Sequence, residues 1–187
     1  MKRQHIRLTA QLKITAVIVI ALTLVEAINL FTARSLNIWG ILPRSEEHWI
    51  GIFAAPFLHG SVSHFSSNII PLAIFTMLVL QHGLKRFCYA SVFIILVTGV
   101  LVWLFGRPAI HVGASGLIYG YFGFLLVAGF VSREFKLISI SLLVGFLYGG
   151  MIWGVLPLSP YISFESHLFG ALSGAVAGFI WGKDKSR

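Results

Sequence analysis

Charged residues are scarce in this chain: only 11% of its 187 residues are Asp, Glu, Lys or Arg, whereas 57% are hydrophobic and the mean hydropathy is +0.89. A soluble globular domain carries about 25% charged residues. The sequence has too little polar surface to face water on all sides, which excludes an ordinary soluble fold and predicts a membrane protein. Cysteine is also nearly absent, and because Cys88 is the single one, an internal disulfide is excluded.

The sequence also lacks any linker. No internal repeat, low-complexity tract or stretch rich in proline and serine divides it, so we predict one transmembrane domain over residues 1–187. Short cytoplasmic tails are expected at about 1–12 and 183–187.

Long apolar runs are what the chain has in place of charge. A helix needs roughly 20 apolar residues to cross the hydrocarbon core of a bilayer. Six runs of this kind occur, at about 13–33, 65–83, 87–106, 114–132, 136–155 and 164–182. The first could be a cleaved signal peptide, but it is long and ends without a small-x-small cleavage site. The expected fold class is therefore an all-α membrane protein, a bundle of six transmembrane helices.

The positions of the basic residues predict the orientation of this bundle. Of the 14 Lys and Arg residues, eleven fall in segments on the side of the N-terminus and three, Arg34, Arg44 and Arg107, fall on the other side. Basic residues accumulate on the cytoplasmic side of membrane proteins, so both termini are predicted to be cytoplasmic. The net charge of +8 is then a topology signal, and no nucleic-acid partner is expected.

Polar side chains inside the apolar runs indicate a candidate site, because such groups are costly in hydrocarbon and suggest function by default. They are His64 and Asn68 at the start of the second run, Ser115 in the fourth and His167 in the sixth. Alone, each has a structural explanation: serine often caps a helix, and the others could hydrogen-bond a neighbouring helix. With both termini inside, however, all three helices run inward, and the four residues lie within roughly 10 Å of the outer surface at about 1.5 Å per residue. A shared depth favours one site.

Three motifs carry a more specific signal. They are His59-x4-His64-x3-Asn68, Gly113-Ala114-Ser115-Gly116 and Ser166-His167-Leu168-Phe169-Gly170-x3-Gly174. In this order, over roughly residues 50–182, the set resembles the rhomboid family of intramembrane serine proteases. The resemblance implies a compact six-helix bundle with a water-filled cavity open to the outside. It also implies that the substrate is another membrane protein, cut in or near its transmembrane helix.

The resemblance has two further implications and one departure. Tyr119, one turn after Ser115, matches a position where rhomboids place an aromatic ring against the catalytic histidine. The loop from Leu156 to Phe164 is expected to cap the site and to move aside for substrate. The Trp-Arg pair that many rhomboids carry in the first outer loop is absent, and Trp39-Gly40 is the nearest equivalent.

The residue types predict a catalytic dyad. Ser115 Oγ would attack the scissile carbonyl, and His167 would take its proton and return it to the leaving amine. No carboxylate is available as a third member, because Glu165 is two residues from His167 and points away from it. The Ser115 backbone N–H at a helix start, the Asn68 amide and His64 would stabilise the oxyanion.

Supporting roles complete the hypothesis. Gly113 and Gly116 are expected to leave room for the substrate backbone, while His59 acts mainly through stability. Glu26 is expected to make a hydrogen bond between helices, and His111 needs no special role. No cofactor or metal is expected. The expected partners are membrane-protein substrates and the lipid bilayer, in a bacterial inner membrane with the site opening to the periplasmic or extracellular side.

Three other functions are compatible with part of the sequence. A proton-relay transporter would use Glu26, His64 and His167 but leaves the Gly-x-Ser-Gly motif unexplained. A non-catalytic rhomboid-like protein that binds membrane helices typically lacks the serine or the histidine, and both are present here. A metalloprotease using His59, His64 and His167 is disfavoured, because this spacing is not that of His-Glu-x-x-His and no carboxylate sits in the motif.

Overall fold

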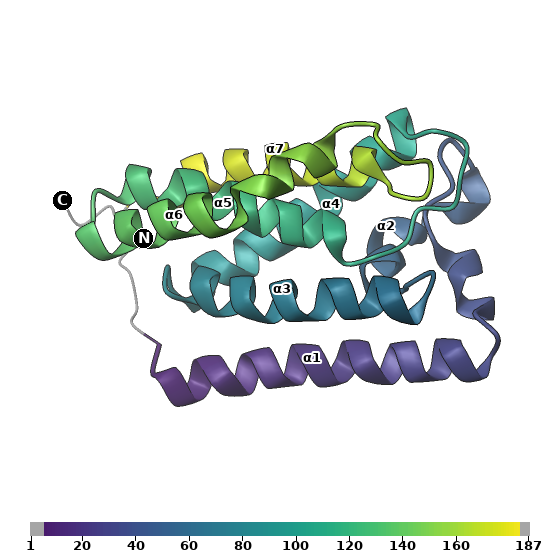
Figure 1. The fold of residues 1–187 in the computed structure, drawn as a ribbon, viewed down its shortest axis with the longest axis horizontal. Helices are drawn as coiled ribbons and strands as arrows, with labels where there is room; N and C mark the ends of the chain where they lie inside the picture. Colours follow the sequence, from purple (N-terminus) through teal and green to yellow (C-terminus); the bar gives the residue numbers. More distant parts are fainter. Residues whose placement is uncertain (1–5, 184–187) are drawn as a thin grey trace.

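The computed structural model describes residues 6–183, which form a bundle of helices (Figure 1). The α-helices are α1 (Leu8–Phe31), α2 (Gly51–Ala54), α3 (Val62–Leu80), α4 (Leu84–Phe105), α5 (Ser115–Ser132), α6 (Phe135–Tyr148) and α7 (Phe164–Trp181). The 3-10 helices are η1 (Ser35–Trp39), η2 (Glu46–His48), η3 (Ala55–Phe57) and η4 (Gly149–Val155). An isolated antiparallel bridge joins Ile41 to His111.

Five helical segments are long and apolar enough to cross a membrane. They are α1, α3, α4, α5 and the segment Phe135–Val155, which α6 and η4 form together. These segments indicate an integral, multi-pass membrane protein. The sixth run predicted from the sequence does form a helix, α7, of 18 residues, but this helix is not among the five and its first turn contains Glu165 and His167. The count of six membrane spans therefore stays a prediction.

Two helical segments differ in detail from the apolar runs of the sequence. The first helix begins at Leu8, before the run at about 13–33, and in its first turn Gln11 is buried and accepts a hydrogen bond from Gln81 Nε2 (2.6 Å). The fifth run is not a single α-helix, since the chain changes to 3-10 geometry at Gly149 and Gly150, where η4 begins. The remaining parts of the predicted tails, 1–5 and 184–187, lie outside the described residues.

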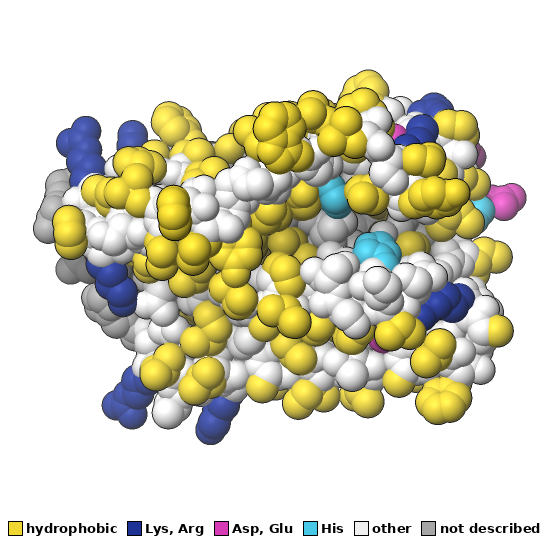
Figure 2. Space-filling model, in the orientation of Figure 1, with side chains coloured by type: hydrophobic (Ala, Val, Ile, Leu, Met, Phe, Trp, Pro, Cys, Tyr) yellow, Lys and Arg dark blue, Asp and Glu magenta, His cyan; other side chains and the backbone are white. Residues whose placement is uncertain are grey.

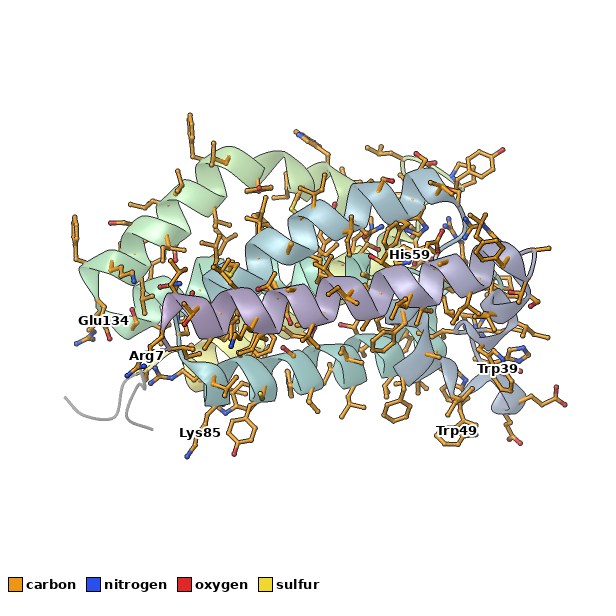
Figure 3. The ribbon with its side chains drawn as sticks, turned by 90° about the horizontal axis from the view of Figure 1, so that it is seen from below. Arg7, Trp39, Trp49, His59, Lys85 and Glu134 are labelled. Carbon is orange, nitrogen blue, oxygen red and sulfur yellow. The ribbon has the colours of Figure 1, made fainter. Side chains whose placement is uncertain are left out.

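The bundle has two unlike ends. α1 begins and α7 ends at the same end, together with the short α3–α4 and α5–α6 connections (Figure 1). The other end, which we call the loop end, holds the three longer connections, residues 32–61, 106–114 and 156–163. Figure 3 shows Arg7 and Lys85 at the first end and Trp39 and His59 at the loop end.

α5 is the central helix of the bundle. It packs against α3, α4, α6 and α7, whereas α1 lies at the edge and packs on α3 (Figure 1). Side chains around the circumference of α5 are buried, among them Ile118, Tyr121 and Phe124. The helix that begins at Ser115 is thus held by neighbours on every side.

α5 and α7 approach each other backbone to backbone at glycines that recur along both helices. A Cβ built on Gly170 would overlap the Gly116 carbonyl, and one built on Gly174 would overlap the Gly120 carbonyl. Any side chain at either position would force the helices apart. Because the contact repeats every four residues along both helices, it fixes a single register between them.

Gly174→Ala is expected to lower the free energy of unfolding by at least about 1–3 kcal/mol, the usual cost of overpacking, because the new methyl group meets a backbone carbonyl. Gly145→Ala is the matched control, since its Cβ would meet only Leu126 Cδ2 at 3.4 Å. Alanine favours a helix over glycine by about 0.5–1 kcal/mol, so this control should be neutral or stabilising. Thermal unfolding in detergent, followed by circular dichroism, measures both. Equal stability of Gly174→Ala and the native chain would contradict the close contact.

Candidate active site

A cavity of about 830 Å³ opens at the loop end of the bundle. Figure 2 shows this face hollowed, with histidine side chains at the hollow. Five of the predicted site residues line the cavity: His64, Asn68, Ser115, Tyr119 and His167. The structure therefore brings together side chains from α3, α5 and α7, far apart in the sequence. Additional serines line the cavity, so its wall is polar enough to bind water.

The first turn of α3 carries His64 to the cavity. Ser61 is the N-cap of this helix, and its Oγ accepts a hydrogen bond from the His64 backbone N–H (3.0 Å), one of the donors that a helix start leaves without partners. One turn further on, Asn68 Nδ2 donates to the His64 carbonyl (2.7 Å). An amide group has two N–H hydrogens. Asn68 can therefore keep this bond and donate once more to a group in the cavity.

The chain turns into α5 directly before Ser115. Gly113 has a φ of +127°, a conformation that side chains rarely adopt, and a Cβ there would lie 2.8 Å from the His64 ring. Glycine at this position both makes the turn and lets the His64 imidazole approach. The Ala114 N–H then donates to His59 Nε2 (3.4 Å). Ser115 is the first residue of α5, so its backbone N–H lies among the unpaired donors of a helix start.

Two contacts orient the imidazole of His167. Its ring stacks on that of Tyr119, with centroids 4.0 Å apart and 8° between the planes. Its Nδ1 lies 2.9 Å from the Gly154 carbonyl oxygen. Because a carbonyl can only accept, Nδ1 carries the hydrogen and Nε2 is the basic nitrogen. A backbone carbonyl thus holds the position that a carboxylate takes in a catalytic triad.

Ser115 and His167 face the same cavity, but within residues 6–183 no direct hydrogen bond joins their side chains. Catalytic hydrogen bonds are often long in a free enzyme and shorten when substrate binds. The arrangement can supply a nucleophile, a base held in the correct tautomer, and donors for an oxyanion.

Gly116 has a different environment from the one expected. It does not line the large cavity but lies against α4 and α7, where a Cβ would come within 3.2 Å of Thr98 Cγ2 and 3.4 Å of the Ser166 carbonyl. The absence of a side chain at this position therefore serves helix packing. The expectation that Gly116 leaves room for substrate is not supported by this geometry.

His59 is fully buried beside the cavity and connects three parts of the chain. Its carbonyl accepts hydrogen bonds from Asn29 Nδ2 (3.3 Å), Arg34 Nη1 (2.7 Å) and Asn37 Nδ2 (3.1 Å). Burial, with smaller effects from His64 and Arg34, lowers the pKa of His59 from 6.5 to about 3. The ring is therefore neutral, and its Nε2 can accept the bond from the turn before α5. A role through stability fits this position and stays a prediction.

Glu26 was expected to hydrogen-bond a neighbouring helix, but among residues 6–183 its carboxylate binds a residue just after its own helix, so that expectation is wrong. Its carboxylate pairs with Arg34, in the turn directly after α1, at 2.8 Å. Arg34 has a φ of +64°, so the chain reverses there and the guanidinium returns to the end of α1. The ion pair holds the guanidinium where it also reaches the His59 carbonyl.

Sequence reasoning missed two groups at the site. His111 is buried, lines the cavity and lies with Nδ1 2.6 Å from Ser163 Oγ, the N-cap of α7. The sequence predicted no special role for it, because a polar residue in a loop is ordinary. The Gly154 carbonyl has no side-chain signal at all. Glu165 was expected to point away from His167. Its Oε1 accepts a hydrogen bond from the Arg107 backbone N–H (3.2 Å), in the connection between α4 and α5.

His59 and His64 meet through their ring edges and faces, with ring centroids 5.2 Å apart. In the part of the chain that the structure describes, no group of three or more His, Cys, Asp or Glu side chains is placed to hold a metal ion.

Comparison with known proteins identifies the family. Residues 46–184 match the rhomboid domain. An uncharacterized protein of Mycobacterium tuberculosis is 38% identical over 168 residues, covering 85% of this chain and 70% of that protein. An uncharacterized protein of Mycobacterium leprae is 39% identical over 170 residues, covering 85% of this chain and 66% of that protein. The mitochondrial RHOMBOID-like protein 6 of Arabidopsis thaliana is 29% identical over 147 residues, covering 76% of this chain and 46% of that protein. The matched segment includes all three sequence motifs and the cavity they line, and the chain belongs to the rhomboid family.

Proposed function

We propose that this protein is an intramembrane serine endopeptidase that cleaves membrane-protein substrates in or near a transmembrane helix. The observation that carries the proposal is that Ser115 and His167 line one cavity, with His167 held by the Gly154 carbonyl in the tautomer whose Nε2 is basic. Membership of a family that includes serine proteases supports it.

The proposed reaction follows acyl-transfer chemistry. Ser115 Oγ attacks the scissile carbonyl carbon while His167 Nε2 takes the hydroxyl proton. The C–N bond then breaks as His167 gives this proton to the leaving amine, and water hydrolyses the acyl-enzyme with His167 again as base. The Ser115 backbone N–H, the second Asn68 N–H and His64 would stabilise the oxyanion, aided by the positive end of the α5 dipole.

We further propose six membrane spans, with α7 as the sixth, both termini in the cytoplasm and the loop end outside. Lys and Arg residues gather at the end opposite the loops, in agreement with the positive-inside rule. The three arginines at the loop end have structural reasons to be there, because each donates to a backbone carbonyl. Arg34 binds His59 (2.7 Å), Arg44 binds Gly106 (2.9 Å) and Arg107 binds Ile162 (2.6 Å). In a bacterial inner membrane, the cavity would then open to the periplasm or the exterior.

The orientation is tested by single-cysteine labelling in a Cys88→Ser background. Tyr161→Cys, whose position is almost fully exposed in the loop end, should react with a membrane-impermeant maleimide in intact cells. Lys85→Cys should react only after the membrane is made permeable. The reverse pattern would place the cavity on the cytoplasmic side and contradict the proposed topology.

Ser115→Ala and His167→Ala are each expected to abolish cleavage of a model single-span substrate by the purified protein. Combining them should cost little more than either alone, because members of one catalytic unit are strongly non-additive. Ser139→Ala, on the exposed face of α6, is the matched serine control and should cleave at the native rate. EDTA should also leave the rate unchanged. Undiminished cleavage by Ser115→Ala would end the serine-protease proposal, and no cleavage by the native chain would favour a non-catalytic helix binder.

Asn68→Ala tests the oxyanion donors. It should lower kcat by up to about 10²–10³-fold, the usual cost of one such donor, although His64 and the Ser115 N–H could reduce the loss. KM should change little, since the bond strengthens only as charge develops. His64→Ala should behave similarly. The variant also loses the bond from Asn68 to the His64 carbonyl, so thermal stability must be measured alongside. Lower stability with an unchanged kcat of the folded protein would make Asn68 a packing residue only.

A further inference from the structure

A short hydrogen bond joins the two segments that lead into the candidate dyad. His111 Nδ1 lies 2.6 Å from Ser163 Oγ. His111 precedes Ser115 by four residues, and Ser163 precedes His167 by four residues. The bond therefore links the segment that leads to Ser115 with the segment that leads to His167. We propose that His111 is a positioning residue, which fixes the start of α7 against the turn into α5 and so sets where His167 lies relative to Ser115. This inference rests on the proposed protease function.

The direction of each hydrogen bond follows from its partners. His111 Nε2 lies 3.1 Å from the Arg107 carbonyl, which can only accept, so Nε2 carries the hydrogen. In a neutral ring Nδ1 must then accept, and the Ser163 hydroxyl donates to it. Ser163 Oγ in turn accepts from the Ser166 backbone N–H (3.2 Å). One imidazole thus binds the loop backbone on one side and the cap of α7 on the other.

Burial supports the neutral form of this ring. His111 is almost fully buried, and burial lowers its pKa, opposed by the hydrogen bond to the Arg107 carbonyl and by the Glu165 charge. A neutral ring at physiological pH keeps the hydrogen-bond directions fixed.

The backbone of His111 is anchored on the side away from α7. Its N–H donates to the Ile41 carbonyl (2.8 Å), and its carbonyl accepts from the Ile41 N–H (3.0 Å). The side chain therefore extends from a fixed point to Ser163. A displacement of about 1 Å at a reacting group can lower the rate about 10²-fold. Loss of this single contact can therefore lower the rate by displacing His167 from Ser115.

Other contacts keep the two segments together without His111. Arg107 Nη2 donates to the Ile162 carbonyl (2.6 Å), and Glu165 Oε1 accepts from the Arg107 backbone N–H. Removing the imidazole nitrogens should therefore leave α7 attached to the loop. What it removes is the bond that fixes the helix cap itself.

The test compares three variants of the full-length protein with the native chain. His111→Phe keeps the ring but has no nitrogen, and it should lower kcat by roughly 10–100-fold with KM changed by less than about twofold. Labelling of Ser115 by a fluorophosphonate should slow by a similar factor. His111→Asn can accept from the Ser163 hydroxyl through Oδ1, close to the place of Nδ1, and should recover most of the rate. Adding Ser163→Ala to His111→Phe should lower kcat little further, because both substitutions remove the same bond between positions 111 and 163. It should lower the Tm further, because it also removes the helix cap that accepts from the Ser166 backbone N–H.

Thr98→Val is the matched control for stability. It removes another buried hydrogen bond to α7, between Thr98 Oγ1 and Ser173 Oγ (2.9 Å), further from the loop end. It should lower the Tm without lowering kcat. If His111→Phe loses Tm but keeps kcat, as this control does, the positioning role is overturned while the protease function stands. If the native chain neither cleaves substrate nor reacts with the fluorophosphonate, the proposed function fails, and this inference fails with it.

Discussion

The backbone contact between α5 and α7 is the constraint on which the site depends. Packing helices in a membrane gains little from the hydrophobic effect, because lipid tails are as apolar as the side chains. Close approach through glycine is then a main source of attraction, and here the carbonyls of Gly116 and Gly120 occupy the space that side chains at 170 and 174 would need. Ser115 and His167 each lie in the first turn of one of these helices. Their approximate separation is therefore set by helix register, and the proposed positioning contact between His111 and Ser163 would fix it more finely.

The proposed base, His167, is also oriented by a backbone group. A buried carboxylate near hydrocarbon would be costly, and the Gly154 carbonyl fixes the tautomer of His167 without a charge. This acceptor lies in η4, where the chain has left α-helical geometry. Position 154 also requires glycine, because a Cβ would overlap the Tyr119 hydroxyl and lie 3.3 Å from His167 Nδ1. The ring is thus held by one stacked aromatic and one backbone atom.

Sequence reasoning succeeded where a residue type contrasts with its surroundings. Polar residues such as Ser115 and His167 stand out inside apolar runs. It failed where the signal is carried by backbone conformation. The positive φ of Arg34, which returns its guanidinium to Glu26, has no marker in the sequence, and neither has the carbonyl of Gly154. His111 was expected to need no special role, because the sequence does not show the burial of a loop residue, which depends on the tertiary fold.

The cavity lies at the loop end of the bundle, where water can reach it although the rest of the helices are suited to hydrocarbon. Many polar groups there bind one another in two networks, one centred on the His59 carbonyl and one on the His111 ring. Among the described residues, Asn29 Oδ1, His59 Nδ1 and Glu165 Oε2 are buried without a partner, which costs stability. Ser115 and Asn68 line the cavity outside these two networks, so Ser115 Oγ and the second Asn68 N–H can be directed to a substrate. In the proposed mechanism, these hydrogen-bond networks hold the loop segments around the water-accessible cavity, so that the catalytic groups keep their relative positions at the membrane surface.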